Sequence, residues 1–180
     1  MPTKEERINN LKQANAKSHE LIKEALKDAL YEMIKEKDIN KIKVIDLIKK
    51  AGVSRSCFYK YYYLPKDILI EDWISIVKDI GAKLGADIIE NWKIIFTKVY
   101  EYKEIISIFF EANLGMEFLN ILNQALYEIK DVKLYYYISI WNGAIFQSIL
   151  SWEKRGFKES VDEITELIVK YTKPIIVDEL

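Results

Sequence analysis

Apolar residues recur at helical spacing along almost the whole chain, and this period constrains the fold more than any other feature. Between residues 18 and 37 they form one stripe: Leu21, Ile22, Ala25, Leu26, Ala29, Leu30, Met33 and Ile34. Intervals of three and four residues are typical of an amphipathic helix. No stretch alternates as an exposed strand does, and 6 Gly and 3 Pro are too few for many tight turns. The sequence therefore predicts an all-α fold.

Capping residues divide the first part of this pattern into helices. Ser18 is placed to cap a first helix over 18–37. A short second helix over 44–51 is expected to end at Gly52, because glycine readily takes the left-handed conformation of a helix C-cap. These signals predict a pair of helices, one long and one short, near the start of the chain.

Further capping signals follow. Ser54 can cap a third helix that runs to about Tyr62, and Pro65 suits the first turn of a fourth that extends into the high eighties. Ser160 and Glu163 fit a capping box. The remaining predicted helices cover 91–102, 103–112, 115–130, 131–155 and 160–173.

Composition excludes several classes of protein. Cys57 is the single cysteine, so an intrachain disulfide is impossible, which fits a reducing cytoplasm; we expect the thiol to fill space rather than to sense redox state. The polar N-terminus, MPTKEERINN, has no apolar signal segment. His19 has no His or Cys nearby, and neither a nucleophile–base set nor a Gly-rich phosphate loop is present. We therefore expect no enzyme, no metal and no cofactor.

Charge is distributed unevenly. Residues 1–66 hold 15 Lys and Arg against 9 Asp and Glu, a net of +6, whereas residues 67–180 hold 12 against 19, a net of −7. A basic first third is typical of a part that binds a polyanion, although chance clustering of surface lysines gives the same count. The uncharged stretch from Leu134 to Trp152 is too polar for a membrane span, so it predicts a buried helix within a core or between subunits.

The stretch AGVSRSCFYKYYY, residues 51–63, carries the clearest motif. Ala51 is small where two helices approach, Gly52 makes a turn, and Val53 and Phe58 suit a small core. Two short helices joined in this way, after a longer helix, are typical of a helix-turn-helix, whose second helix enters the major groove of DNA.

The same region resembles the DNA-binding domain of the TetR/AcrR family of bacterial regulators. The resemblance covers INKIKVIDLIKKAGVSRSCFYKYYYLPKDIL, Ile39 to Leu69. WNGAIFQSILSWEKRGFKESVDEITELI, Trp141 to Ile168, resembles the last two helices of that family, which commonly form a four-helix dimer interface. The resemblance implies a DNA-binding domain over 1–66 and a dimerisation and ligand domain over 67–180. It also implies a homodimeric transcriptional regulator, with repression as the expected mode.

The motif and the resemblance together give a predicted DNA contact set: Lys43, Ser54, Arg55, Ser56, Tyr59, Lys60, Tyr61 and Lys66. Side chains in the first turn of the recognition helix reach base edges, whereas Lys and Tyr further along reach phosphates. Tyr59 packed into the core is the alternative. Two residues depart from the pattern of the resembling family. Lys43 stands where that family usually has a capping Thr, and Pro65 stands where it has a Lys that binds a phosphate. We expect Lys66 to bind the phosphate instead.

In the resembling family the second domain often encloses a small apolar or aromatic ligand. The predicted ligand contacts are Trp92, Phe96, Tyr100, Phe110 and Tyr137, with simple core packing as the alternative. The predicted dimer interface consists of Trp141, Ala144, Ile145, Ser148, Trp152, Ile164, Leu167, Ile168 and Tyr171. A symmetric dimer predicts a palindromic operator. The alternative function is a co-regulator that keeps the fold but binds a partner protein instead of DNA.

Overall fold

Helices make up all the regular structure that the computed structural model describes, which is the backbone of residues 4–176 and the side chains of residues 17–172. This confirms the predicted all-α class. The chain divides into two units, residues 1–70 and 71–180, and the division falls within helix α4 (Lys66–Gly81). Their assignment to DNA binding and to dimerisation stays a prediction.

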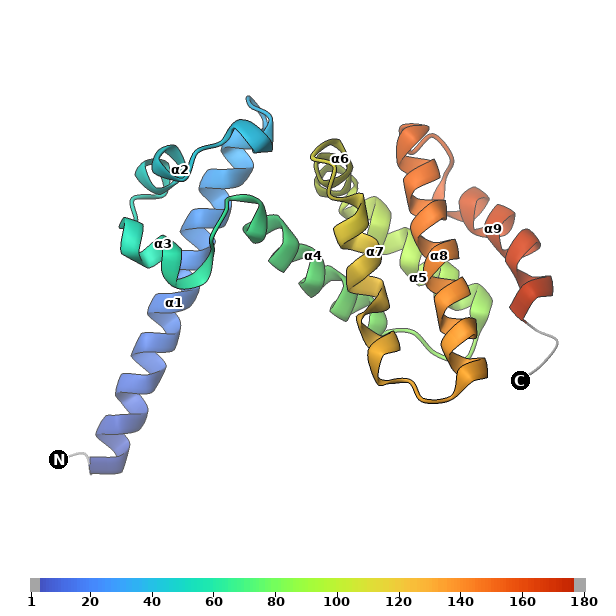
Figure 1. The fold of residues 1–180 in the computed structure, drawn as a ribbon, viewed down its shortest axis with the longest axis horizontal. Helices are drawn as coiled ribbons and strands as arrows, with labels where there is room; N and C mark the ends of the chain where they lie inside the picture. The colour runs from blue at the N-terminus through green and yellow to red at the C-terminus, as the bar shows by residue number, and fades with distance from the viewer. Residues whose placement is uncertain (1–3, 177–180) are drawn as a thin grey trace. The chain divides into compact units, whose positions relative to one another are not determined.

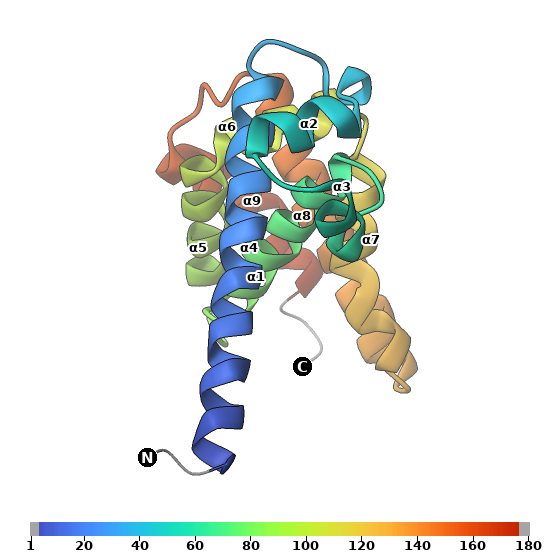
Figure 2. The ribbon, with the colours of Figure 1, turned by 90° about the vertical axis from the view of Figure 1, so that its left-hand side faces the viewer.

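The first unit is built on one long helix. Its elements are α1 (Lys4–Ile34), the short 3-10 turn η1 (Ile39–Lys41), α2 (Val44–Ala51) and α3 (Arg55–Tyr61). α2 and α3 lie beside the C-terminal half of α1, and the N-terminal half extends beyond them (Figures 1 and 2). The predicted cap at Ser18 was wrong, because α1 begins at Lys4. Residues 4–17 contain neither Gly nor Pro and include Lys, Glu, Arg, Leu and Ala, which favour helices, so nothing stops the helix there.

Large apolar side chains hold α1, α2 and α3 together. Leu26, Leu30, Leu47 and Phe58 have no exposed surface, and Tyr62 is buried as well. The core position predicted for Phe58 is therefore confirmed. Fully burying side chains of this size stabilises a fold by about 1.5–3 kcal/mol each.

The turn between α2 and α3 depends on its glycine. Gly52 has φ +67°, a left-handed conformation that side chains disfavour, and its N–H closes α2 by donating to the Ile48 carbonyl. α2 begins at the predicted residue and ends at the predicted residue. Its first turn lacks a side-chain cap, as expected for Lys43 in place of Thr.

The second unit is a helical bundle. After the C-terminal part of α4 it contains α5 (Ile88–Glu101), α6 (Lys103–Glu111), α7 (Gly115–Asn123), the 3-10 segment η2 (Gln124–Glu128), α8 (Val132–Lys154) and α9 (Val161–Ile176). α5 packs along α9, and α8 packs against α6, α7 and α9. The predicted capping box is confirmed: Ser160 N–H donates to Glu163 Oε2 at 2.8 Å, and Glu163 N–H donates to Ser160 Oγ at 3.2 Å.

Helix α4 ends at Gly81, earlier than the predicted high eighties. Two glycines and a new cap explain the early stop. The Asn91 side chain accepts from the Gly85 N–H and donates to the Gly85 carbonyl, both at 2.8 Å, which fixes the turn. Asp87 then caps α5 by accepting from the N–H groups of its first turn.

Within the described part of the chain, no single helix combines the length and the apolarity needed to cross a membrane. The predicted buried helix over Leu134 to Trp152 belongs to α8, and it is buried only in part. Ile145, Ile149 and Trp152 are buried in the second unit, whereas Leu134, Tyr135, Tyr136 and Ile140 are exposed, so within one chain the prediction was wrong for the first half of the stretch.

Candidate nucleic-acid interface and effector cavity

The start of α3 is an exposed turn on a firmly anchored helix. Ser54 caps it, with its Oγ accepting from the Cys57 N–H at 3.1 Å, as predicted. The fully buried Phe58 fixes the opposite face. Ser54, Arg55 and Ser56 are all exposed, and the hydroxyls of the two serines lie 2.9 Å apart. Hydroxyl and guanidinium donors are thus presented together on one turn.

Arg55 and Tyr59 form a pair on this surface. The Arg55 guanidinium carbon lies 5.5 Å from the centre of the Tyr59 ring, within the range of a cation–π contact. Tyr59 packs edge-to-face on Phe58, with ring centres 5.3 Å apart, yet the side chain stays 42% exposed. The core therefore holds Tyr59, and Tyr59 in turn orients Arg55.

The end of α3 differs from the prediction. Lys60 is exposed, and its Nζ lies 3.0 Å from Nε2 of His19 on α1. Tyr61 is only half-exposed, and its hydroxyl is buried without a hydrogen-bond partner in the part of the chain that the structure describes. The expectation that Tyr61 offers its hydroxyl to a phosphate is therefore contradicted. The residue faces α1 instead, with its ring centre 5.6 Å from that of His19.

α3 and its cap hold six of the eight predicted contacts, and Lys43 and Lys66 lie at the starts of other helices. Lys43 is exposed at the N-cap of α2, and Lys66 is half-buried as the first residue of α4. Asp67 fixes the loop before α4, because its Oδ2 accepts from the Tyr63 and Leu64 N–H groups at 2.9 and 2.8 Å.

One exposed ion pair joins α1 to α2. Lys50 Nζ lies 2.7 Å from Glu32 Oε2. The hydrogen bond to Lys50 lowers the pKa of Glu32, and the same bond raises the pKa of Lys50. Exposed pairs of this kind contribute little to stability.

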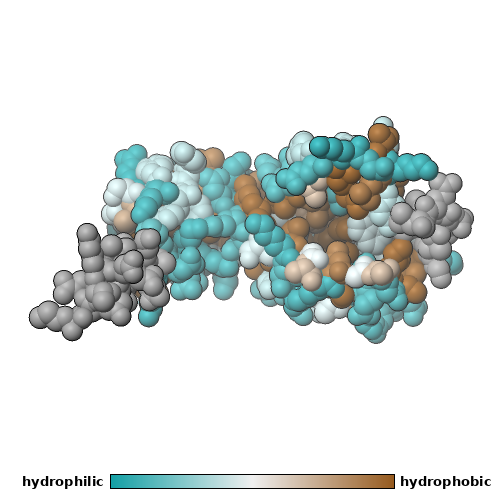
Figure 3. All heavy atoms as spheres, turned by 90° about the horizontal axis from the view of Figure 1, so that it is seen from below, coloured by the Kyte–Doolittle hydropathy of each residue, from teal (hydrophilic) through white to brown (hydrophobic). Residues whose placement is uncertain are grey.

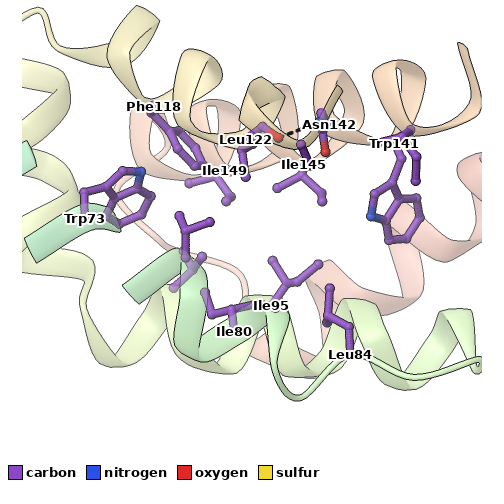
Figure 4. Close-up of a pocket in the computed structure, with 15 residues that line it drawn as sticks. Trp73, Ile80, Leu84, Ile95, Phe118, Leu122, Trp141, Asn142, Ile145 and Ile149 are labelled. Atoms are coloured by element: carbon purple, nitrogen blue, oxygen red, sulfur yellow. Dashed lines mark hydrogen bonds between the residues drawn. The ribbon is translucent and has the colours of Figure 1, made fainter. Parts of the chain in front are cut away.

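A cavity of about 320 Å³ lies within the second unit (Figure 4). Apolar residues of α4, α5, α7 and α8 line it, with Trp73 at one end, Trp141 at the other and Asn142 between them. The lining also contains Gly81 and Ala125, which are solvent-exposed, so the cavity opens to the surface there. Hydrophobic side chains gather on the face of the second unit seen in Figure 3.

None of the five residues predicted to contact a ligand lines this cavity, so the predicted ligand contacts are wrong for this cavity. Ile95 and Val99 of α5 line the cavity, whereas Trp92 and Phe96 lie on another side of the same helix. Those two rings stack 5.3 Å apart, and Trp92 Nε1 donates to Thr172 Oγ1 of α9 at 3.1 Å. The other three lie elsewhere as well: Tyr100 stacks on Trp152, Phe110 lines a separate surface pocket, and Tyr137 is half-buried outside the cavity.

A second hollow, a groove between α8 and α9, coincides with part of the predicted dimer interface. It includes Ser148, Trp152, Ile164, Leu167 and Ile168 from that prediction, together with Gln147, Ser151, Arg155 and Glu159. Trp141 and Ile145 instead line the 320 Å³ cavity. Because these two side chains line the cavity, a dimer contact on this side of the chain would use the groove and exposed residues beside it, such as Tyr171, which is 65% exposed.

Comparison with known proteins identifies the fold. No family model matches the chain, and no curated protein matches it. The crystal structure of Lin0861 from Listeria innocua is similar with a TM-score of 0.69 at 12% sequence identity, over 84% of this chain and 91% of that one. The fatty acid degradation regulator FadR from Bacillus halodurans has a TM-score of 0.53 at 16% identity, over 87% and 95%. At such low identities the similarity establishes a shared fold.

Proposed function

We propose that this chain is a DNA-binding transcriptional regulator of the TetR/AcrR type. The observation that carries the proposal is the first turn of α3, where Ser54, Arg55 and Ser56 are exposed on a helix anchored by Phe58. Such a turn is what a recognition helix presents to base edges in the major groove. The fold shared with FadR, a fatty acid degradation regulator, supports the same function.

Charge supports a nucleic-acid partner. Residues 1–66 carry a net charge of +6. Lys43 and Lys60 are exposed near the ends of α2 and α3, where phosphates flank a helix inserted in the groove. We assign base contact to Arg55 and Ser56, and phosphate contact to Ser54, Lys43, Tyr59, Lys60 and Lys66.

The regulator acts as a repressor and as a homodimer on a palindromic operator. We place the dimer interface at the groove between α8 and α9, with Leu167 and Tyr171 as exposed apolar contacts. Two copies would carry two α3 helices to half-sites about one helical turn apart, roughly 34–36 Å. An apolar effector in the 320 Å³ cavity releases the protein from DNA.

Selection from a pool of randomised DNA duplexes tests this function. We expect the purified protein to enrich one palindromic sequence, and an Arg55→Ala variant to enrich none or a sequence degenerate at the contacted base. Enrichment of the same sequence by the variant would remove Arg55 from base reading. No enrichment by the natural chain would favour the protein-binding co-regulator.

A further inference from the structure

The lining of the 320 Å³ cavity restricts what can occupy it. We propose that its ligand is an uncharged, elongated apolar molecule with one hydrogen-bond donor, such as a medium-chain alcohol, rather than an ionised acid. This inference rests on the proposed function only in calling the ligand an effector. The binding chemistry follows from the side chains alone.

The uncharged lining opposes the burial of an ionic group inside the cavity. None of the described residues that form the cavity wall is a Lys, Arg, His, Asp or Glu. An ionised carboxylate or phosphate buried there would lose its hydration without gaining a counter-charge, and this loss opposes binding. A neutral molecule can enter the cavity without this loss of ionic hydration.

The polar side-chain atoms of the wall belong to Asn142 and to the two indoles. Trp73 Nε1 is a buried donor without a hydrogen-bond partner among the described residues, and the orientation of the Asn142 amide is fixed. Its Nδ2 donates to the Leu122 carbonyl at 2.9 Å and to Asn123 Oδ1 at 3.1 Å. A flipped amide would place its oxygen against two acceptors. The Oδ1 is therefore turned away from both, toward the cavity (Figure 4), and it accepts no hydrogen bond from the described residues.

The Oδ1 of Asn142 and the Nε1 of Trp73 together favour a hydroxyl in the ligand, because a hydroxyl can donate to the first or accept from the second. Asn142 is only 6% exposed, so its Oδ1 gains most from a partner that enters the cavity. A hydroxyl can donate to it, whereas an ionised carboxylate cannot. The rest of the ligand must be apolar to match the aliphatic walls between Trp73 and Trp141.

The test compares three small molecules on the purified full-length protein without DNA, by calorimetric titration and thermal unfolding. Octanol can donate a hydrogen bond, its isomer heptyl methyl ether cannot, and octanoate is ionised at neutral pH. We expect octanol to bind roughly 3- to 10-fold more tightly than the ether, which lacks one hydrogen bond. Octanoate should bind weakest. Equal binding of octanol and octanoate, or no binding of octanol, would overturn the proposal.

Variants locate the site. Val77 lines the cavity and is half-buried, so Val77→Phe should fill part of the space and weaken octanol binding at least about tenfold. Val132→Phe is the matched control, because Val132 is 69% exposed and lies outside the cavity. Unchanged binding to Val77→Phe would contradict the assignment. If octanol binds as expected but leaves DNA affinity unchanged, the ligand assignment stands and the effector role fails.

Discussion

At the residue scale, the two neighbouring tyrosines Tyr59 and Tyr61 have opposite environments. Tyr59 is 42% exposed beside Arg55, whereas the Tyr61 hydroxyl is buried. We predict that Tyr59→Phe weakens operator binding by about 1 kcal/mol, through loss of a hydroxyl–phosphate hydrogen bond. Tyr61→Phe should leave DNA affinity unchanged. Anisotropy titrations of both variants on one duplex provide the check.

Tyr61→Phe should also affect stability in a definite direction. Its hydroxyl has no hydrogen-bond partner among the described residues, and a buried unsatisfied polar group costs about 1–3 kcal/mol. Removing the oxygen should therefore leave the free energy of unfolding unchanged or raise it. A loss above about 1 kcal/mol in urea unfolding would show that the hydroxyl has a stabilising partner.

The exposed turn of Ser54, Arg55 and Ser56 could be predicted from the sequence because that motif is local. The burial of the Tyr61 hydroxyl and the contact of His19 with Lys60 could not be predicted, because both depend on how α1 and α3 pack. The 3.0 Å approach of His19 to Lys60 joins residues 41 positions apart. No spacing rule within one helix reveals such a pair.

At the element scale, α3 depends on its N-cap. Ser54 Oγ accepts from the Cys57 N–H, so Ser54→Ala should destabilise the protein by about 1 kcal/mol. Ser18→Ala is the matched control, since Ser18 is exposed inside helix α1 and caps nothing. Thermal unfolding should show a lower midpoint for Ser54→Ala alone. Equal midpoints for the two variants would mean that the cap contributes nothing.

The capping box of α9 gives a pH-dependent prediction. The backbone N–H and the hydroxyl of Ser160 donate to the Glu163 carboxylate, and these hydrogen bonds lower its pKa in the folded chain. A carboxyl group whose pKa is lower in the folded chain than in the unfolded chain stabilises the fold at pH values above the unfolded pKa. This stabilisation is lost as the pH falls through the folded pKa. Glu163→Gln should therefore unfold at a lower temperature than the natural chain at neutral pH, and the difference should shrink in acid.

Glu166→Gln is the control for this effect. It removes the same charge from the same helix, but no capping hydrogen bond is lost. A difference between Glu163→Gln and the natural chain that stays constant down to strongly acidic pH would contradict the assigned linkage.

The presence of the helices was predictable from the sequence, but several of their boundaries were not; the predicted helix over 115–130, for example, divides at Asn123 into α7 and the 3-10 segment η2. Gly52 and Ser54 mark the turn between α2 and α3 correctly, because each acts through local backbone chemistry. Ser18 was wrongly predicted to cap α1, because a good capping residue also fits within a helix when strong helix formers precede it. The end of α4 was missed because the bonds between Asn91 and Gly85 form only in the folded turn.

At the scale of the whole molecule, a buried aromatic residue in the sequence can belong to a core or to a cavity. Trp92 and Phe96 were candidates for ligand contact, yet both are fully buried in the packing of α5, with Trp92 hydrogen-bonded to Thr172 of α9. The cavity is lined by Ile95 and Val99 of the same helix. Helical period shows which residues are apolar, but it cannot show where neighbouring helices leave space.

The proposed dimer gives a test of assembly. Leu167 lines the groove between α8 and α9 and is 46% exposed, so Leu167→Glu should place a charge in the interface and yield a monomer. Ile89→Glu on α5 is a matched control, because Ile89 is 49% exposed and lies outside the groove. Sedimentation equilibrium distinguishes the two. A Leu167→Glu variant that remains dimeric would place the interface elsewhere.

The most direct test of DNA recognition is the affinity of the Arg55→Ala variant for the selected operator across a range of salt concentrations. The natural chain should bind tightly, with an affinity that falls steeply as salt rises. Arg55→Ala should lose about 1–3 kcal/mol of binding to the operator, whereas Lys130→Ala, which removes one charge from the second unit, should bind like the natural chain. Binding by Arg55→Ala that equals that of Lys130→Ala at every salt concentration would contradict the account.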